Sequence, residues 1–233
     1  MNEVEIRCAM NDEQRKNYRW MVAMARPGWK SLFTPLAGYT MLTRLSLVAT
    51  ISARVNSDGG ISMAGNPLDR RSEKIDDLAT AIGDFPAPVL VVTNFPQVAR
   101  TARQRLRRDA GELIVEDLAP RPANNSLDIH RRQVDRYQNG EIGALVTALP
   151  WVRPFDYLSA TRTVVYLDRS WDVVTELVVS LNAAQHAETV VTYKSLDTVE
   201  MHQHRGLEEL QSAVTDDDRA ADFLAGRLFD EGE

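Results

Sequence analysis

The residues that could bind a phosphate or a metal ion are few and poorly arranged. Residues 59–65 hold three glycines, but the lysine and the helix start that complete a phosphate-binding loop do not follow them. We expect a flexible loop there. Glu116 and Asp117 follow the apolar run 113–115 and mimic the end of a strand that binds Mg²⁺ beside a nucleotide. Without a phosphate-binding loop, they do not complete a nucleotide site.

The histidines and the cysteine do not form a catalytic or metal-binding set. His202 and His204 lie two residues apart, so on a helix their rings point about 200° apart and do not share one ion. We expect both on a solvated surface. His130 and His186 have no evident partner, and Cys8 is the only cysteine. The sequence therefore predicts no metal site and no catalytic residue.

Composition restricts the class of protein. The chain has 233 residues, a net charge of −6 and 44% hydrophobic residues, which is ordinary for a globular protein and argues against coating nucleic acid by bulk charge. No apolar run reaches the roughly 18 residues of a membrane span, and the N-terminus lacks the apolar stretch of a signal peptide. A single cysteine fits a reducing compartment. We expect a cytoplasmic protein without a membrane partner.

The periodicity predicts an α/β fold. Short apolar runs that favour strands buried on both faces alternate with helical stretches, and this order indicates βαβ units and a parallel sheet. The predicted strands are 89–92, 113–115, 144–146, 163–167 and 189–193. The helices predicted around them are 96–108, 127–137, 171–184 and 199–214.

Helices are predicted before the first of these strands. Asn11 and Gln14 form a capping box for a helix that Pro27-Gly28 ends. Further helices open at Thr34-Pro35 and at Ser72. We therefore divide the chain into an N-terminal helical segment, an α/β core and an acidic tail, at residues 1–85, 86–215 and 216–233. The tail is expected to solubilise the protein; the alternative is that it mimics a phosphate backbone.

A series of segments between Asn11 and Leu210 carries a family resemblance. These segments are 11–18, Leu42-Thr43-Arg44-Leu45, Arg71–Leu78 with its Ser-x-Lys core, Val89–Phe95, His130–Gly140, Ala144–Thr147, Leu158-Ser159-Ala160, Ser170-Trp171-Asp172 and Thr198-Val199-Glu200. In this order they resemble the C-terminal RecA-like lobe of superfamily-two helicases, specifically the Swi/Snf-type DNA translocases. The resemblance implies a RecA-like parallel sheet of about five strands flanked by helices and preceded by two to three helices.

The sequence departs from this family where ATP is hydrolysed. Residues 154–157 replace the Gly-Leu pair of motif V, and Asn182 and Gln185 stand where motif VI has arginines that reach the γ-phosphate. Neither side chain stabilises the transferring phosphoryl group as a guanidinium does. We therefore expect no ATP hydrolysis and no cofactor bound by this chain alone. ATP and Mg²⁺ would be bound only in a pair with a first motor lobe.

The resemblance also implies contact with the DNA backbone. Side chains that follow the predicted strands would face the nucleic acid, and arginine-rich helices would add phosphate contacts. The candidate residues are Thr93, Asn94, Arg100, Arg103, Arg131, Arg132 and Thr147. The alternatives are that Thr93 and Asn94 only cap the next helix, and that the arginines are solvated or paired with carboxylates.

Three functions remain open from the sequence. The chain is the C-terminal lobe of a helicase or translocase whose ATP-binding lobe is a separate chain, as in some phage genomes, which would place it in the host cytoplasm. Alternatively, it is a helicase-derived pseudo-enzyme that acts as an adaptor or inhibitor of another protein. That function predicts an apolar docking patch drawn from Trp29, Phe33, Trp151 and Phe155, unless these side chains are core. The third alternative is an unrelated α/β enzyme.

Overall fold

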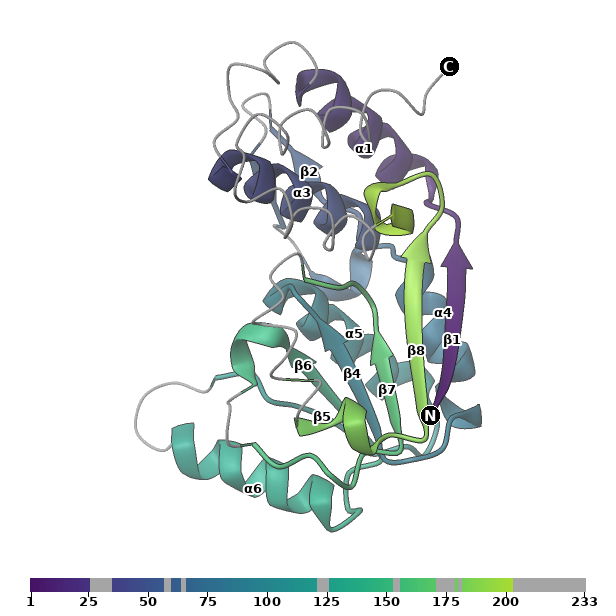
Figure 1. Cartoon of the computed structure of the whole chain (residues 1–233), viewed down its shortest axis with the longest axis vertical. Helices are drawn as coiled ribbons and strands as arrows, with labels where there is room; N and C mark the ends of the chain where they lie inside the picture. The colour runs from purple at the N-terminus through teal and green to yellow at the C-terminus, as the bar shows by residue number, and fades with distance from the viewer. Residues whose placement is uncertain are drawn as a thin grey trace.

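A computed structural model places six parallel strands in one sheet (Figure 1). It describes residues 1–25, 35–56, 60–63, 66–120, 126–152, 156–170, 179 and 182–202. The strand order is β1-β8-β7-β4-β6-β5. The strands are β1 (Asn2–Cys8), β4 (Val89–Thr93), β5 (Val115–Asp117), β6 (Ala144–Ala148), β7 (Thr163–Tyr166) and β8 (Thr189–Ser195).

The centre of the sheet is the core of the protein. Every residue of β4, β6 and β7 is buried, as expected of parallel strands that are covered on both faces. The five strands predicted from the sequence are confirmed. The largest difference is in β5, which begins at Val115 and not at Leu113.

The sixth strand, β1, was missed because it has no apolar run. Its sequence alternates charged with apolar residues, and its first four residues are exposed. It nevertheless pairs with β8 along its whole length, from Asn2 opposite Thr189 to Cys8 opposite Ser195. The segment expected to be helical over residues 1–85 therefore also contributes a strand to the core sheet.

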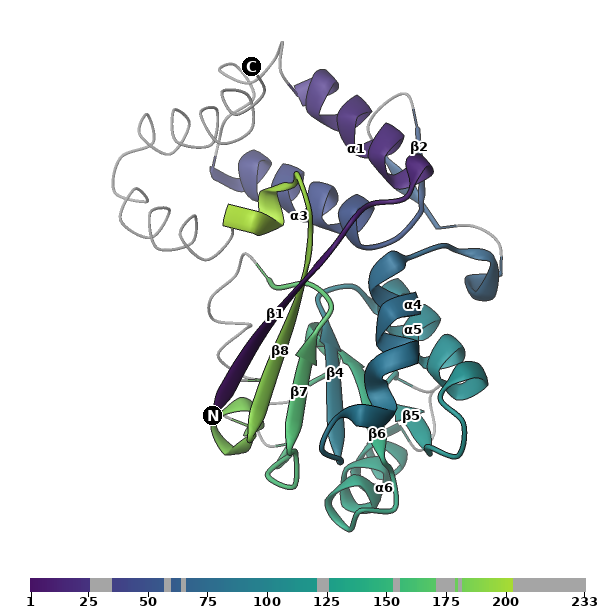
Figure 2. The same ribbon diagram turned by 90° about the vertical axis from the view of Figure 1, so that its right-hand side faces the viewer.

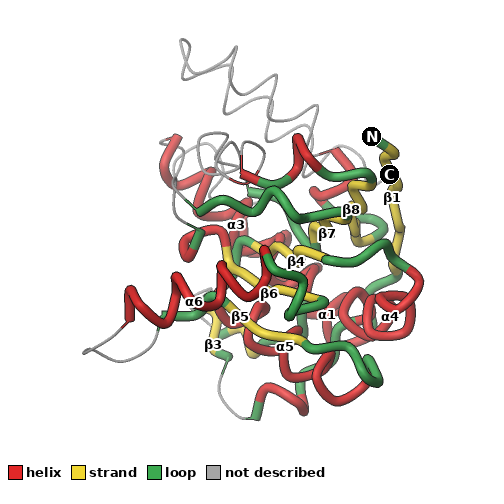
Figure 3. The backbone as a smooth tube through the Cα atoms, turned by 90° about the horizontal axis from the view of Figure 1, so that it is seen from below, coloured by secondary structure: helices red, strands yellow, loops and turns green. Residues whose placement is uncertain are grey.

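Helices cover both faces of the sheet. The helices α4 (Glu73–Ala81) and α5 (Pro96–Asp109) lie on one face, and α6 (Ser126–Gln138) lies on the other (Figure 3). This arrangement follows from right-handed crossovers, because the chain moves one way along the sheet through α5 and returns through α6. Ser72 caps α4 as predicted, since its hydroxyl accepts a hydrogen bond from the Ile75 N–H.

Two further helices pack beyond the carboxyl ends of the strands (Figures 1 and 2). These are α1 (Asp12–Ala25) and α3 (Pro35–Thr50). The predicted capping box at the start of α1 is confirmed: the Gln14 N–H donates to Asn11 Oδ1 over 3.0 Å, and the Asn11 N–H donates to Gln14 Oε1 over 3.2 Å. The two helices share a separate apolar cluster that consists of Met10, Tyr18, Met21, Leu42, Leu45, Val48, Ala49 and Val199.

The remaining elements are short. A hairpin joins β2 (Arg54–Val55) to β3 (Ile61–Ser62). Because β3 lies within residues 59–65, the prediction of a flexible loop is wrong at Ile61 and Ser62, which pair with β2. Among the residues that the structure describes, the 3₁₀ turns are η2 (Pro67–Asp69), η3 (Ile82–Asp84), η5 (Leu149–Trp151), η6 (Ala184–His186) and η7 (Val199–His202). Most of the predicted helices 171–184 and 199–214, and the acidic tail, lie outside the described residues. Within the described ranges no helix has the length and apolar character needed to cross a membrane.

Candidate functional site

The carboxyl end of the sheet carries a buried aspartate. Asp168, which follows β7, is 1% exposed and accepts hydrogen bonds from the Thr93 hydroxyl and, over 2.7 Å, from the Asn94 N–H. Burial raises the pKa of Asp168 to about 7, against the opposing effects of the bond from Thr93, the charge of Lys74 and the bond from Asn94. Asp168 therefore joins the end of β4 to the end of β7.

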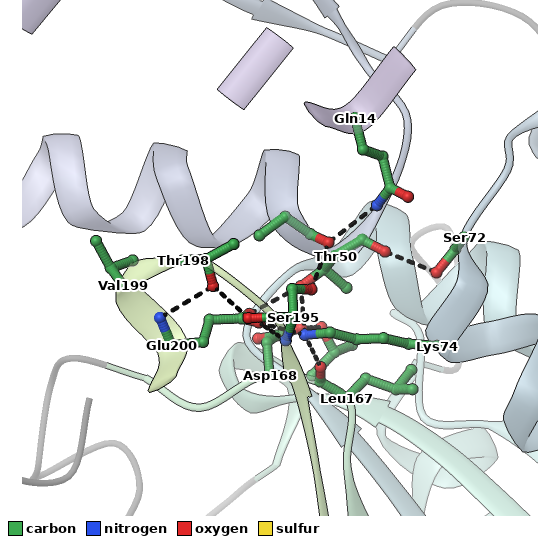
Figure 4. Close-up of polar contacts among 12 residues, drawn as sticks. Gln14, Thr50, Ser72, Lys74, Leu167, Asp168, Ser195, Thr198, Val199 and Glu200 are labelled. Carbon is green, nitrogen blue, oxygen red and sulfur yellow. Dashed lines mark hydrogen bonds and ion pairs between the residues drawn. The ribbon is translucent and has the colours of Figure 1, made fainter. Parts of the chain in front are cut away.

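A buried ion pair lies beside this aspartate (Figure 4). The Lys74 Nζ is 2.6 Å from Glu200 Oε2, and both side chains are 2% exposed. The same ammonium group donates to the Leu167 carbonyl oxygen over 2.8 Å and to the Thr50 hydroxyl over 3.4 Å. Lys74 comes from α4 and Glu200 from η7, so the pair joins segments that are 126 residues apart.

Glu200 is held by the end of β8 and by α3. Its Oε2 accepts from the Ser195 N–H over 2.8 Å, and its Oε1 accepts from the Thr50 hydroxyl over 3.3 Å. The Ser195 hydroxyl donates to the Ala49 carbonyl oxygen, which also accepts from Gln14 of α1. We call Thr50, Lys74, Asp168, Ser195 and Glu200 the polar hub. It connects three strand ends to the N-terminal helices.

The polar hub holds segments of the fold together and is not arranged as an active site. Its charged groups are buried, so a dissolved substrate does not reach them in the folded chain. Each carboxylate accepts several hydrogen bonds, which offsets the cost of removing it from water. The sequence identified the segments that carry Lys74 and Glu200, because both belong to the family resemblance. Their pairing follows only from the fold.

Two of the candidate nucleic-acid residues are fully buried. Thr93 and Thr147 are both 0% exposed; the Thr93 hydroxyl donates to Asp168 and the Thr147 hydroxyl donates to the Ala148 carbonyl oxygen. Asn94 is partly exposed. The alternative that Thr93 and Asn94 cap the next helix is met only in part. Phe95 is the N-cap of α5 and makes no side-chain cap bond, but its N–H donates to the Thr93 hydroxyl over 3.2 Å.

The arginines of α5 are in different environments. Arg103 forms ion pairs with Glu116, over 3.3 Å, and with Asp117, over 3.5 Å. This pairing also accounts for the two carboxylates that mimic a metal-binding strand end. Arg100 is exposed, and its guanidinium lies 5.9 Å from the ring centre of Trp151. Trp151 itself is only 8% exposed.

The arginines of α6 face solvent. Arg131 and Arg132 are both exposed. Their helix, α6, lies on the opposite face of the sheet from α5, which carries Arg100 and Arg103 (Figure 3). The structure therefore does not bring the two arginine sets together. Trp29, Phe33 and Phe155, the other members of the expected docking patch, lie outside the described residues.

The two residues that the resemblance places at the motif VI arginine positions, Asn182 and Gln185, lie near the amino end of β8. Asn182 and Gln185 precede β8, and the Asn182 carbonyl oxygen accepts from the Leu158 N–H over 3.2 Å. Gln185 is exposed, with its Nε2 3.1 Å from the ring Nε2 of His186. A guanidinium is present nearby in Arg162, which forms an exposed pair with Glu188 over 2.8 Å.

One histidine has a partner that the sequence did not reveal. The Nε2 of His130 on α6 lies 2.9 and 2.8 Å from the two carboxylate oxygens of Asp156, and both residues are buried. The pair fastens the loop before β7 to α6. Within the part of the chain that the structure covers, no three His, Cys, Asp or Glu residues are grouped to hold a metal ion, and His204 lies outside it.

The arrangement of the sheet and its helices defines a RecA-like lobe. Solved structures of similar fold include the C-terminal part of the Fun30 ATPase domain, with a TM-score of 0.65 and 12% identity over 97% of each chain. The C-terminal domain of the SWI2/SNF2 ATPase of Sulfolobus solfataricus matches with a TM-score of 0.62 and 17% identity, over 92% of this chain and 88% of that one.

This chain also matches about half of a longer solved structure. The SWI2/SNF2 ATPase core of Sulfolobus solfataricus in complex with dsDNA has a TM-score of 0.59 and 16% identity; the match covers 95% of this chain but 46% of that one. No family model and no curated protein matches the sequence. The chain has the fold of the C-terminal RecA-like lobe of SWI2/SNF2 ATPases.

Proposed function

We propose that this chain is the C-terminal motor lobe of a DNA helicase or translocase, and that it acts with an ATP-binding lobe on a separate chain. The observation that supports the motor lobe is the fold, which matches the C-terminal part of the Fun30 ATPase domain over 97% of both chains. The sequence adds that a phosphate-binding loop is missing. ATP and Mg²⁺ are then bound by the partner lobe, and this chain binds neither alone.

The second candidate function is that of a helicase-derived pseudo-enzyme. It is favoured by Asn182 and Gln185, which stand where the resemblance expects arginines. An amide does not offset charge on a transferring phosphoryl group. In this role the chain binds another protein as an adaptor or inhibitor and takes no part in ATP hydrolysis. Both functions place the chain in the cytoplasm, that of the host if a phage encodes it.

DNA is the proposed nucleic-acid partner. The Sulfolobus ATPase core of similar fold was solved with dsDNA. Among the candidate residues, the exposed Arg131 and Arg132 of α6 are suited to phosphate contacts, whereas Arg103 is engaged by two carboxylates. We therefore assign the phosphate contacts to α6, and neither to Arg103 nor to Arg100, which lies on α5 across the sheet from α6.

The test is capture of the tagged chain with its partners from the native host, followed by ATPase assays on the purified complex. We expect a stoichiometric partner with a phosphate-binding loop and a DNA-stimulated ATPase that is lost when this chain is removed. The Asn182→Arg/Gln185→Arg variant then raises the rate, up to the roughly 10³-fold of an arginine finger. Gln97→Arg, which adds a charge at an exposed position of α5, is the control.

DNA binding is measured on the same complex. Arg131→Gln/Arg132→Gln lowers DNA affinity and reduces the slope of log K against log salt by about 0.9 for each phosphate that the variant no longer neutralises. Arg103→Gln, which removes one positive charge that is already paired with Glu116 and Asp117, leaves the slope unchanged. A captured partner without a phosphate-binding loop, or a complex whose ATPase does not depend on this chain, would favour the pseudo-enzyme.

A further inference from the structure

The strand β1 is the terminal strand of the six-stranded sheet in the described part of the chain. An edge strand presents a row of backbone N–H and C=O groups that can pair with another strand. Natural edges are commonly shortened, bent or covered, but β1 runs for seven residues, and all seven are in register with β8. Figure 2 shows β1 extended along the side of the sheet.

The backbone bonds show which residues face the open edge. The Asn2 N–H donates to the Glu188 carbonyl oxygen, and the Cys8 carbonyl oxygen accepts from the Leu196 N–H. Because successive residues of a strand direct these groups to opposite edges, the even-numbered residues bond to β8. The N–H and C=O groups of Glu3, Glu5 and Arg7 therefore point away from the sheet.

The side chains of β1 are arranged to complement a second copy of the same strand. If two β1 strands pair antiparallel about a twofold axis at Glu5, the outward-facing residues meet one another. Glu3 of each chain lies opposite Arg7 of the other, which gives two cross-strand ion pairs. On the opposite face, Val4 of each chain lies opposite Ile6 of the other, which gives two apolar pairs.

Glu5 lies on the axis, opposite its own copy. The repulsion that this would cause is reduced within each chain, because the Glu5 carboxylate accepts from Lys194 Nζ over 2.6 Å and from Arg7 Nε over 2.7 Å. These bonds, with that from Lys194 the larger cause, lower the pKa of Glu5. The two Glu5 carboxylates can therefore lie opposite each other at the twofold axis, because each is already paired with cations of its own chain.

Exposure of apolar groups on β1 supports the same pairing. Val4 is 37% exposed although it lies in a strand, and Ile6 is only partly buried. Pairing with a second copy would cover both side chains. DNA does not fit this edge, because the two carboxylates and one guanidinium of β1 give it a net negative charge, which repels phosphate groups.

We propose that this edge is a homodimer interface, in which two copies of β1 pair antiparallel with Glu3 opposite Arg7 and join two sheets into one. The interface is small, so the dimer belongs to the weak class of complexes. The proposal is independent of the proposed motor function, because it concerns only the isolated chain.

The test is sedimentation equilibrium of the full chain at low salt, up to about 1 mM chain. We expect a monomer–dimer equilibrium for the wild-type chain. Glu3→Arg and Arg7→Glu each turn two attractive pairs into repulsive ones, so each weakens the dimer at least about 10-fold. Both side chains are exposed, so circular dichroism should show an unchanged fold in either variant.

Two combinations restore the complementarity. The double variant Glu3→Arg/Arg7→Glu carries the same cross-strand pairs with the charges exchanged. We expect it to recover the dimer in part, because Glu5 on the axis loses its bond from Arg7 but keeps that from Lys194. An equimolar mixture of the two single variants should form a heterodimer although neither variant dimerises alone. These rescues separate pairing of the strands from an effect of net charge.

Three results would overturn the proposal. The first is a wild-type chain that stays monomeric up to the highest concentration. The second is a dimer whose affinity does not respond to Glu3→Arg. The third is a dimer that is lost in both single variants but recovered neither by the double variant nor by the mixture.

Discussion

The two ends of the sheet hold their charges in opposite ways. At the carboxyl end, the polar hub buries Lys74, Asp168 and Glu200 and draws bonds from four separate segments of the chain. At the amino end, Arg162 and Glu188 form a solvent-exposed pair near Gln185. The first arrangement fixes the packing of the N-terminal helices. The second arrangement is exposed to water, so its side chains can be substituted at little cost in stability.

This difference follows from desolvation. A buried charge that loses its partner keeps the whole cost of its removal from water, whereas an exposed charge regains solvent. The carboxyl end is therefore expected to tolerate few substitutions, and the amino end many. The amino end is also where the sequence departs from the motif VI arginines.

Removal of Lys74 should give the largest effect. Lys74→Met leaves Glu200 as a buried carboxylate without its ammonium partner, so we expect the free energy of unfolding to fall by about 3–5 kcal/mol. Urea denaturation measures this loss. Lys74→Met/Glu200→Gln removes both charges and keeps an acceptor for the Ser195 N–H, so it should recover part of the stability. A loss below about 1 kcal/mol, the usual value of an exposed pair, would contradict the importance of the hub.

The pH dependence of stability should report on Asp168. Its pKa of about 7 in the folded protein lies above the ordinary value of about 3.9, so the folded state binds the proton more tightly than the unfolded state. The stabilisation is fully present below about pH 4 and is lost as the pH rises through about 7.

The measurement compares the wild-type chain with Asp168→Asn in denaturant titrations between pH 4 and 8. We expect the wild-type chain to lose about 2–4 kcal/mol relative to the variant over this range, because one pKa unit corresponds to about 1.36 kcal/mol. Asp197→Asn, at an exposed position, is the control and should keep the wild-type profile. Parallel profiles for the wild-type chain and Asp168→Asn would refute the assignment.

The smallest effect is expected at the amino end. Arg162→Gln removes the exposed pair with Glu188, and both groups then remain in water, so the midpoint of thermal unfolding should not change measurably. Differential scanning calorimetry on this variant and on Lys74→Met tests the comparison directly. A clear drop for Arg162→Gln would show that the amino end also depends on its ion pair.

The sequence predicted the elements that carry a local signal. Continuous apolar runs identified β4, β6 and β7, and side chains close in sequence identified the capping box of Asn11 and Gln14. The strand β1 was missed because its stability comes from β8, and its own residues alternate as in a solvated segment.

The candidate site was less accessible to prediction. Thr93 was correctly placed at a strand end, but its burial and its bond to Asp168 depend on β7 lying next to β4. Lys74 and Glu200 are an ordinary lysine and an ordinary glutamate in the sequence. Likewise, His130 finds Asp156 only through the packing of a loop on α6. Contacts between distant segments leave no periodic pattern in a single sequence.

The pairing of β1 with β8 has a consequence for the order of events during synthesis. Asn2 is synthesised before the four strands that lie between β1 and β8 in the order of the sheet strands along the chain, and its partner Thr189 is synthesised after them. Because domains acquire their structure as the chain emerges, the four other strands can assemble while β1 waits. A sheet with such distant contacts forms slowly. During synthesis, β1 therefore lacks its partner strand until β8 has been made.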